Sequence, residues 1–331
     1  CMLTNNQLAA LPAEILGCTA LELIRLADNQ LTSLPDGFLE LPKLAWIALA
    51  GNPLVMQATP LPEPNWIQLA HLELNEQLGA GGGGFVHRAI WSRSQPTDGE
   101  AGMPVAVKLF RDAATVTDGD PMHEIDLGSA LQHPNVIQVL GALAKPKPGL
   151  VLELLSLKQP SDADTDAGAA TGSWKELGLP PNFDTCTRDT YAEGTRFTLP
   201  AAISLLRGVA AACAHLHAKG FTHGDLYAHN TMIRKDGEPK VGDFGAAFNY
   251  TPLGEAALPL VERIEVRAFG CLVEEVVERV DEAGEGEKLV SEKLLAKAKK
   301  EVLVRLGEQC MAGVVLERPS FAQLGDELSQ L

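Results

Sequence analysis

Hydrophobic residues recur with a fixed period at the start of the chain. Asn6, Asn29 and Asn52 stand 23 residues apart, and each is followed two positions later by a leucine. Prolines interrupt the helical period at matching positions, so the segment is not one continuous amphipathic helix. One unit cannot bury its apolar edge alone, and the pattern therefore predicts stacked repeats that share a core.

These units resemble the leucine-rich repeat family. The fuller ones run from Leu3 to Pro12 and from Leu26 to Pro35, and a shorter one ends at Leu54. The resemblance implies that the leucines point into a solenoid core, that each asparagine satisfies backbone groups at a turn, and that the repeats bind a protein partner. Because the chain begins with Cys1 in mid-pattern, we expect it to be part of a longer protein with earlier repeats.

A proline-rich stretch separates the repeats from the rest of the chain. Pro60, Pro62 and Pro64 interrupt the leucine pattern, and such a composition is typical of a semi-rigid extended spacer. We therefore expect the repeats over residues 1–57 and a linker over residues 58–71.

Alternating polar and apolar positions then predict a strand over residues 72–79 and a second over 86–91, joined by a glycine turn. Gly79, Gly81 and Gly84 satisfy G-x-G-x-x-G, which lets backbone N–H groups approach phosphate oxygens. A glycine run also suits a flexible linker, and a dinucleotide-binding loop would open a helix here. The strand-like residues after the turn favour a flap that covers phosphates.

Two charged residues fall at positions expected to be buried. Lys108 stands in the middle of an apolar strand, and Asp120 and Pro121 can begin a helix on which Glu124 shares a face with leucines. An unpaired buried charge is strongly unfavourable. We therefore expect Lys108 and Glu124 to pair, which leaves the ammonium group able to touch a phosphate as well.

The strongest chemical signal is the stretch 223–230, which reads HGDLYAHN, followed by DFG at 243–245. A predicted hairpin between them, turned at Asp-Gly, brings three polar groups together. Asp225 is suited to orient and accept a hydroxyl proton. Asn230 and Asp243 are hard oxygen ligands for Mg²⁺, and together these groups indicate phosphoryl transfer from ATP.

From residue 72 to residue 331 the order and spacing of the motifs resemble the protein kinase family. The resemblance implies an α+β, bilobal fold preceded by the short α/β repeat solenoid. It places the N-lobe and hinge at 72–155, an acidic insertion at 156–197 and the C-lobe at 198–331.

The same resemblance assigns roles to individual residues. Asp225, Lys108 and Glu124 are the implied catalytic residues, and Asn230 and Asp243 are the implied metal ligands. Leu152 is the implied gatekeeper. The implied nucleotide-binding positions are Gly79, Gly81, Gly84, Val86, Ala106, Lys108, Leu152, Glu153, Leu154 and Met232.

The catalytic stretch departs from the family pattern. Gly224 stands where many kinases carry an arginine that reads a loop phosphate, so loop phosphorylation should not be obligatory. Tyr227 replaces the lysine usual in serine/threonine kinases, and His229 stands where tyrosine kinases tend to show arginine. These positions leave the class of hydroxyl acceptor open.

The segment after the catalytic motifs is short. Only 22 residues separate Asp243 from Glu265, and no clear A-P-E triplet occurs. In the family Arg318 would pair with the glutamate of that triplet. We expect Glu255 or Glu262 to substitute for it.

Residues 156–196 are acidic and rich in Gly, Ala and Thr, which predicts a mobile, solvated insertion. The pattern further predicts a helix over 201–220 and an amphipathic surface helix over 288–300. The resemblance to the protein kinase family implies that a central buried helix begins at residue 264.

The composition argues against two classes of partner. The net charge of −16 has the wrong sign for tracking a phosphate backbone or an anionic lipid surface, so we expect neither nucleic acid nor membrane partners. The six cysteines are scattered without a C-x-x-C pair, which favours a reducing compartment. No signal peptide opens the sequence, and we expect a cytoplasmic location.

The sequence thus predicts an ATP- and Mg²⁺-dependent protein kinase, with Ser/Thr favoured over Tyr by base rate alone. One alternative keeps the transfer but changes the acceptor, because His-Gly-Asp with a downstream Asn also resembles aminoglycoside and choline phosphotransferases. The other is a nucleotide-binding pseudokinase scaffold. The DFG triplet, the Lys108/Glu124 pair and the Arg318 motif favour the protein-directed enzyme.

Overall fold

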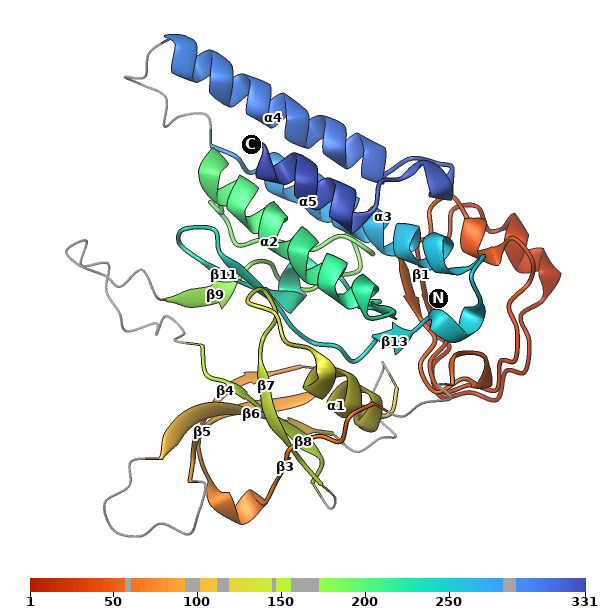
Figure 1. Cartoon of the computed structure of the whole chain (residues 1–331), viewed down its shortest axis with the longest axis vertical. Coiled ribbons are helices and arrows are strands. Elements are labelled where there is room, and N and C mark those ends of the chain that lie inside the picture. The colour runs from red at the N-terminus through yellow and green to blue at the C-terminus, as the bar shows by residue number, and fades with distance from the viewer. Residues whose placement is uncertain are drawn as a thin grey trace.

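The computed structural model describes residues 1–56, 61–81, 83–92, 102–111, 119–144, 147–155, 173–281 and 290–331. Figure 1 shows a sheet with one helix at one end of the molecule, a helical lobe at the other, and the repeats beside that lobe, next to α3 and β13. The expected bilobal α+β architecture with N-terminal repeats is confirmed.

The repeats form a short solenoid. Its strands β1 (Leu23–Arg25) and β2 (Trp46–Ala48) pair in parallel, and its 3₁₀ turns are η1 (Ala13–Gly17), η2 (Phe38–Glu40) and η3 (Pro53–Val55). The buried Asn52 accepts the Leu31 backbone N–H at 3.0 Å and donates to the carbonyls of Leu26 and Leu49. Asn29 makes equivalent bonds one repeat earlier. The predicted role of the repeat asparagines is confirmed.

The N-lobe is a six-stranded sheet of order β3-β7-β8-β6-β5-β4, with α1 packed against β7 and β8. Its elements are β3 (Trp66–Ile67), η4 (Leu69–His71), β4 (Leu72–Ala80), β5 (Gly84–Trp91), β6 (Met103–Phe110), α1 (Pro121–Ala130), β7 (Val139–Leu143) and β8 (Gly149–Glu153). The glycine turn joins β4 to β5 as expected. The Asp120 side chain caps α1 by accepting the Met122 N–H at 2.9 Å.

The predicted linker is partly built into this sheet. Residues 57–60 lie outside the described residues, but Trp66 and Ile67 form β3, which pairs in parallel with β7. The Asn65 amide also donates to the Leu140 carbonyl at 3.0 Å. The end of the linker is therefore an edge strand of the N-lobe as well as a spacer.

The C-lobe is mainly helical. Its elements are β9 (Trp174–Glu176), α2 (Leu199–Ala218), β10 (Phe221–Thr222), η6 (Ala228–Asn230), β11 (Thr231–Arg234), β12 (Pro239–Val241), β13 (Phe248–Asn249), η7 (Thr251–Leu253), α3 (Leu258–Val277), α4 (Val290–Cys310), η9 (Val315–Glu317) and α5 (Phe321–Ser329). Helix α2 is long and apolar enough to span a membrane, with a mean hydropathy of 1.5, and 61% of its apolar window is buried inside the protein. The central helix α3 begins six residues before the predicted start at Ile264.

The described part of the acidic insertion, residues 173–197, is partly packed against the C-lobe. Strand β9 pairs with β11, and Trp174 is buried. Asp189 is also buried, at 5% exposure, because it accepts hydrogen bonds from the catalytic stretch. The prediction of a solvated insertion is wrong for these buried residues, whereas residues 182–184 are exposed as predicted; residues 156–172 lie outside the described ones.

The expected pairing of Arg318 with Glu255 or Glu262 is wrong. The Arg318 guanidinium is buried and donates to three backbone carbonyls, at 2.8 to 3.0 Å, those of Pro42, Arg263 and Ala312. Burial lowers the pKa of this guanidinium to about 10. One of the carbonyls belongs to the repeats, so Arg318 ties the repeats to the C-lobe.

The repeats share a hydrophobic core with the C-lobe. Because side chains alternate along a strand, Ile24 and Ile47 point into the repeat core while Arg25 and Trp46 point outward to the C-lobe. The C-lobe side chains in the same core as the repeat leucines are Phe248, Tyr250, Val261 and Ile264. The strand face of the solenoid is therefore covered by the C-lobe.

Candidate active site

Three charged residues meet where the N-lobe contacts the C-lobe. Lys108 Nζ lies 2.7 and 3.0 Å from the two carboxylate oxygens of Glu124 and 2.9 Å from Oδ1 of Asp243. The predicted Lys108–Glu124 pair is confirmed. Strand β6, helix α1 and the segment after β12 each supply one of the three groups.

Burial and charge oppose each other in this triad. Burial lowers the pKa of Lys108, but the carboxylates of Asp243 and Glu124 outweigh it and raise the pKa above its ordinary value. Burial raises the pKa of Asp243, but the Lys108 ammonium outweighs it and holds the pKa below its ordinary value. Both groups are therefore charged near neutral pH.

Asp243 is held in an unusual backbone conformation. Its φ is +59°, in the left-handed region that non-glycine residues rarely adopt. Such strain persists only where the surroundings enforce it, and it concentrates at functional sites. The Asp243 side chain is 48% exposed, so its carboxylate is partly open to solvent while one oxygen contacts Lys108.

The glycine turn lies close over the lysine. A Cβ placed on Gly83 would lie 3.5 Å from Lys108 Nζ, and one on Gly84 would lie 2.2 Å from the Leu109 carbonyl oxygen. Gly84 therefore admits no side chain, whereas Gly79 and Gly81 face open space. The hollow that Gly83, Glu124 and Asp243 help to line is about 10 Å³, roughly the room for one water molecule.

The other implied nucleotide positions fall on the strands around this turn. Val86 is the register partner of Lys108, and Ala106 that of Leu152. Glu153 ends β8 and Leu154 follows it, half-buried. Met232 lies on β11 of the C-lobe, two residues after Asn230.

Glu153 has further partners that the sequence did not predict. Its carboxylate accepts from Lys240 Nζ at 2.6 Å and from the Gln138 N–H at 2.8 Å. Because Gln138 belongs to the N-lobe and Lys240 to β12 of the C-lobe, Glu153 connects the two lobes at the hinge.

The catalytic stretch lies beside the segment that carries Asp243. The Asn230 amide donates to the carboxylate Oδ2 of Asp225 at 3.0 Å and to its carbonyl at 2.9 Å. The Gly242 N–H donates to the Asn230 carbonyl at 2.9 Å, and His223 Nε2 lies 3.0 Å from the Gly242 carbonyl. These bonds hold the segment that carries Asp243 against the segment that carries Asp225 and Asn230.

The strand-plus-helix N-lobe followed by a mainly helical C-lobe agrees with the comparison to known families. A family model described as protein tyrosine and serine/threonine kinase matches residues 72–255, more than half of the chain, and a leucine rich repeat model matches residues 2–54. The chain belongs to the protein kinase family.

The similar kinases are distant and longer. Tyrosine-protein kinase Btk of Drosophila melanogaster is 24% identical over 292 residues, which cover 78% of this chain and 32% of that protein. The calmodulin-binding receptor kinase CaMRLK of Arabidopsis thaliana is 24% identical over 294 residues, covering 82% and 42%. Non-receptor tyrosine-protein kinase TNK1 of Homo sapiens is 31% identical over 186 residues, covering 55% and 23%. The chain thus spans less than half the length of each of these relatives.

A buried glutamate on α3 anchors the catalytic loop of the kinase. Glu265 accepts from the Thr222 hydroxyl at 2.6 Å and from the Gly224 N–H at 2.8 Å, and it lies 2.8 Å from His217 Nε2. Burial raises its pKa, but His217 and the hydrogen bonds outweigh that effect and lower it. Sequence reasoning missed this role, since a glutamate in a helix carries no local sign of its partners.

The repeats contribute two side chains to the catalytic loop, and sequence reasoning missed both. Arg25 forms an ion pair with Asp225 and donates to the Gly224 carbonyl at 3.0 Å. Trp46 stacks on Tyr227 and donates its indole N–H to the Leu226 carbonyl at 3.0 Å. Their outward positions on the repeat strands predict exposure but give no sign of what they face.

His229 is fixed by the insertion. Asp189 accepts the His229 backbone N–H at 2.7 Å, and its other oxygen lies 2.7 Å from His229 Nδ1. Burial lowers the pKa of His229, but Asp189, helped by the charges of Asp225 and Asp243, outweighs it and raises the pKa. The insertion therefore keeps a protonatable ring next to the site.

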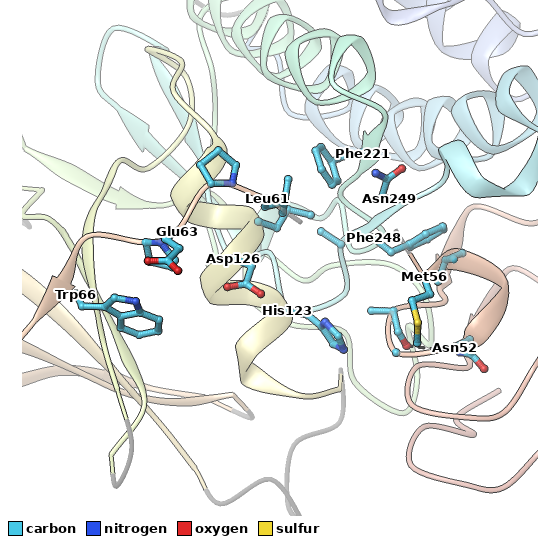
Figure 2. A pocket seen from close by; sticks show the side chains of 17 residues that line it. Asn52, Met56, Leu61, Glu63, Trp66, His123, Asp126, Phe221, Phe248 and Asn249 are labelled. Atoms are coloured by element: carbon cyan, nitrogen blue, oxygen red, sulfur yellow. Dashed lines mark hydrogen bonds between the residues drawn. The ribbon is translucent and has the colours of Figure 1, made fainter. Parts of the chain in front are cut away.

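A separate hollow lies behind α1. Figure 2 shows His123 and Asp126 of α1 facing Phe248 and Asn249 of the C-lobe across it, with Asn52 and Met56 of the last repeat nearby. Its volume is about 430 Å³. Its lining includes none of the residues of the kinase motifs, such as Lys108, Glu124 and Asp243, so it is not the candidate active site.

The repeats also contact α1, the helix that carries Glu124. Asp28 Oδ1 lies 3.7 Å from His123 Nε2. The bond to Asp28 raises the pKa of His123 above its ordinary value, against the effect of burial. The repeats thus contact both the helix that carries Glu124 and the loop that carries Asp225.

Proposed function

We propose that this chain transfers the γ-phosphoryl group of ATP to a hydroxyl of a protein substrate, in a Mg²⁺-dependent reaction. The observation that carries the proposal is that Lys108 Nζ lies within 3.0 Å of carboxylate oxygens of both Glu124 and Asp243, beside an Asp225–Asn230 pair. Positioning and charge compensation are what phosphoryl transfer requires of a protein.

Each residue has a role that its geometry supports. Lys108, held by Glu124, would bind phosphate oxygens. Asp225 would orient the acceptor hydroxyl and accept its proton as the hydroxyl oxygen bonds to the γ-phosphorus. ADP would then depart with the electrons of the broken bridging bond.

The residues present fit a magnesium ion. The half-exposed Asp243 carboxylate is a hard oxygen donor, and Asn230 uses its amide nitrogen on Asp225, which leaves its oxygen as an acceptor. Mg²⁺ commonly takes only one or two protein ligands and completes its shell with waters and phosphates. Asn230 and Asp243 would hold the ion, which when bound neutralises charge on the phosphates.

The acceptor and the setting are also proposals. We propose that the acceptor is Ser/Thr in preference to Tyr. We also propose that the repeat faces left uncovered by the C-lobe bind a protein partner, and that the location is cytoplasmic. Mass-spectrometric mapping of phosphorylated sites after incubation with ATP decides the acceptor. Phosphotyrosine alone would reverse our preference.

Turnover is tested by incubating the chain and its Asp225→Asn and Lys108→Met variants with labelled ATP, Mg²⁺ and casein. We expect the chain to label itself or casein and both variants to lose at least about 100-fold in rate. Equal labelling by the chain and Asp225→Asn would overturn the role of Asp225.

One observation favours a second candidate, a nucleotide-binding scaffold without turnover. Arg25 already pairs with Asp225, and the Asp225 side chain is only 16% exposed. A thermal shift with ATP, with and without Mg²⁺, in the absence of any labelling would support the scaffold.

A further inference from the structure

The catalytic loop has no lysine or arginine of its own. Residues 223–230 read HGDLYAHN, and all of them are described. The cation beside the Asp225 carboxylate comes instead from the repeats, because Arg25 pairs with Oδ1 while Asn230 donates to Oδ2. The carboxylate is thus held between two donors, one from each domain.

Arg25 is placed by two independent constraints. Its strand β1 is fixed in the solenoid by pairing with β2, and its second guanidinium nitrogen donates to the Gly224 carbonyl at 3.0 Å. The residue is only 3% exposed. Gly224 itself is held from the other side by Glu265. The guanidinium therefore has one fixed position relative to Asp225.

The repeats are packed against the C-lobe as a fixed part of the site and do not form a detachable segment. Four C-lobe side chains lie in the same hydrophobic core as the repeat leucines. Ala27 and Ala48 pack on Ala246, and the carbonyls of Pro42 and Lys43 accept from Arg318 and Arg267. Lifting the repeats would expose this core and remove one backbone acceptor from each of the two buried guanidinium groups.

We propose that Arg25 of the leucine-rich repeats is a positioning residue of the phosphoryl-transfer site, which orients the Asp225 carboxylate and balances its charge. This rests on the proposed function. A base must hold its oxygen within hydrogen-bond reach of the hydroxyl, and a guanidinium that also donates to the Gly224 carbonyl holds the Asp225 carboxylate in one orientation. The repeats are on this account part of the catalytic unit as well as a binding module.

The test is chemical rescue. Wild type, Arg25→Ala, Arg25→Lys and Asp225→Asn are assayed for casein labelling with ATP varied, without additive, with millimolar guanidinium, or with millimolar urea as a neutral control of the same shape. Arg305→Ala, which removes an exposed arginine of α4, is the matched control. An ATP-dependent thermal shift confirms that each variant still binds nucleotide.

We expect Arg25→Ala to lose on the order of 100-fold in kcat, with KM for ATP within about 3-fold. Guanidinium, but not urea, restores at least 10-fold, and Arg25→Lys keeps an intermediate rate. Asp225→Asn gains nothing from guanidinium, and Arg305→Ala behaves as wild type.

Three results would overturn the inference. Equal or higher kcat in Arg25→Ala means that Arg25 is idle or blocks the site. If guanidinium does not restore the low activity of Arg25→Ala, and Arg25→Lys is no more active, Arg25 has a purely structural role. If the wild-type chain labels nothing, or if Asp225→Asn labels casein as fast as wild type, the proposed function is refuted. The role of Arg25 is then refuted with it.

Discussion

The indole ring of Trp46 lies flat on the phenol ring of Tyr227, with centroids 4.5 Å apart and planes 2° from parallel. Trp46 belongs to the repeats and Tyr227 follows the catalytic aspartate by two positions. The stack is buried, with Trp46 at 1% exposure. It couples the folding of the repeats to the shape of the catalytic loop.

Replacing this tryptophan should therefore destabilise the whole chain. Trp46→Ala is expected to reduce the free energy of unfolding by about 3–5 kcal/mol, because it opens a cavity and removes the donor to the Leu226 carbonyl. Urea denaturation measures the change. The matched control is Trp66→Ala on edge strand β3, where the side chain is exposed and the expected cost is below about 1 kcal/mol. Similar losses in both variants would mean that the repeats do not pack on the loop in solution.

Gly224 is required by its surroundings as well as by its backbone. Its φ is +72°, and an added Cβ would lie 2.5 Å from the Ala246 carbonyl oxygen and 2.8 Å from that of Ile47. Gly194 has a similar φ of +76° with open space around it. Gly194→Ala should cost about 1–2 kcal/mol for the left-handed conformation alone.

Gly224→Ala should cost clearly more than Gly194→Ala, since both contacting atoms are backbone and cannot rotate away. The midpoints of thermal unfolding of the two variants provide the comparison. Equal shifts would show that Ile47 of the repeats does not press on the catalytic loop.

The Lys108–Glu124 pair should appear as a coupling in stability. Lys108→Met leaves the buried Glu124 carboxylate without its cation, which is expected to cost about 3 kcal/mol. Adding Glu124→Gln to Lys108→Met should recover about 1–3 kcal/mol of that loss. Urea titration of the wild type, the two single variants and the double variant gives the coupling energy. Strictly additive effects would contradict the pairing.

The Asp189–His229 pair predicts a pH dependence of stability. Asp189 raises the pKa of His229 above the ordinary value of 6.5, against the effect of burial. The pair therefore stabilises the fold fully below about pH 6.5, and its contribution is lost as the pH rises through the folded-state pKa.

Asp189→Asn should accordingly destabilise the chain more at about pH 6 than at about pH 9. Urea unfolding of the wild type and the variant at several pH values measures the difference. A destabilisation that is constant with pH would mean that the ring is neutral when it binds Asp189.

Features with a local signature could be predicted from the sequence. The repeat asparagines, the strand–turn–strand flap and the Asp120 cap follow from spacing along neighbouring residues, because the backbone geometry of a repeat, hairpin or helix start is set within a few residues. Lys108 and Glu124 could be paired at a distance because each stands at a buried position where only an opposite charge satisfies it.

Other features were decided only by the tertiary structure. Arg25 lies at an outward position of a repeat strand, and Asp189 lies in a stretch of acidic residues, where the sequence pattern predicts solvent. Both are buried because surfaces distant in the chain, the C-lobe and the catalytic loop, pack over them.

Arg318 is a buried charge whose partner could not be predicted from the sequence. The sequence predicted an anionic partner for Arg318, but its guanidinium donates to carbonyl oxygens. One of them belongs to Pro42, 276 residues away along the chain. The pattern of polar and apolar side chains predicts which positions avoid water, since the tendency to avoid water is a property of each residue and its neighbours. It does not record which distant backbone group will lie against a charge, because that depends on how the domains dock.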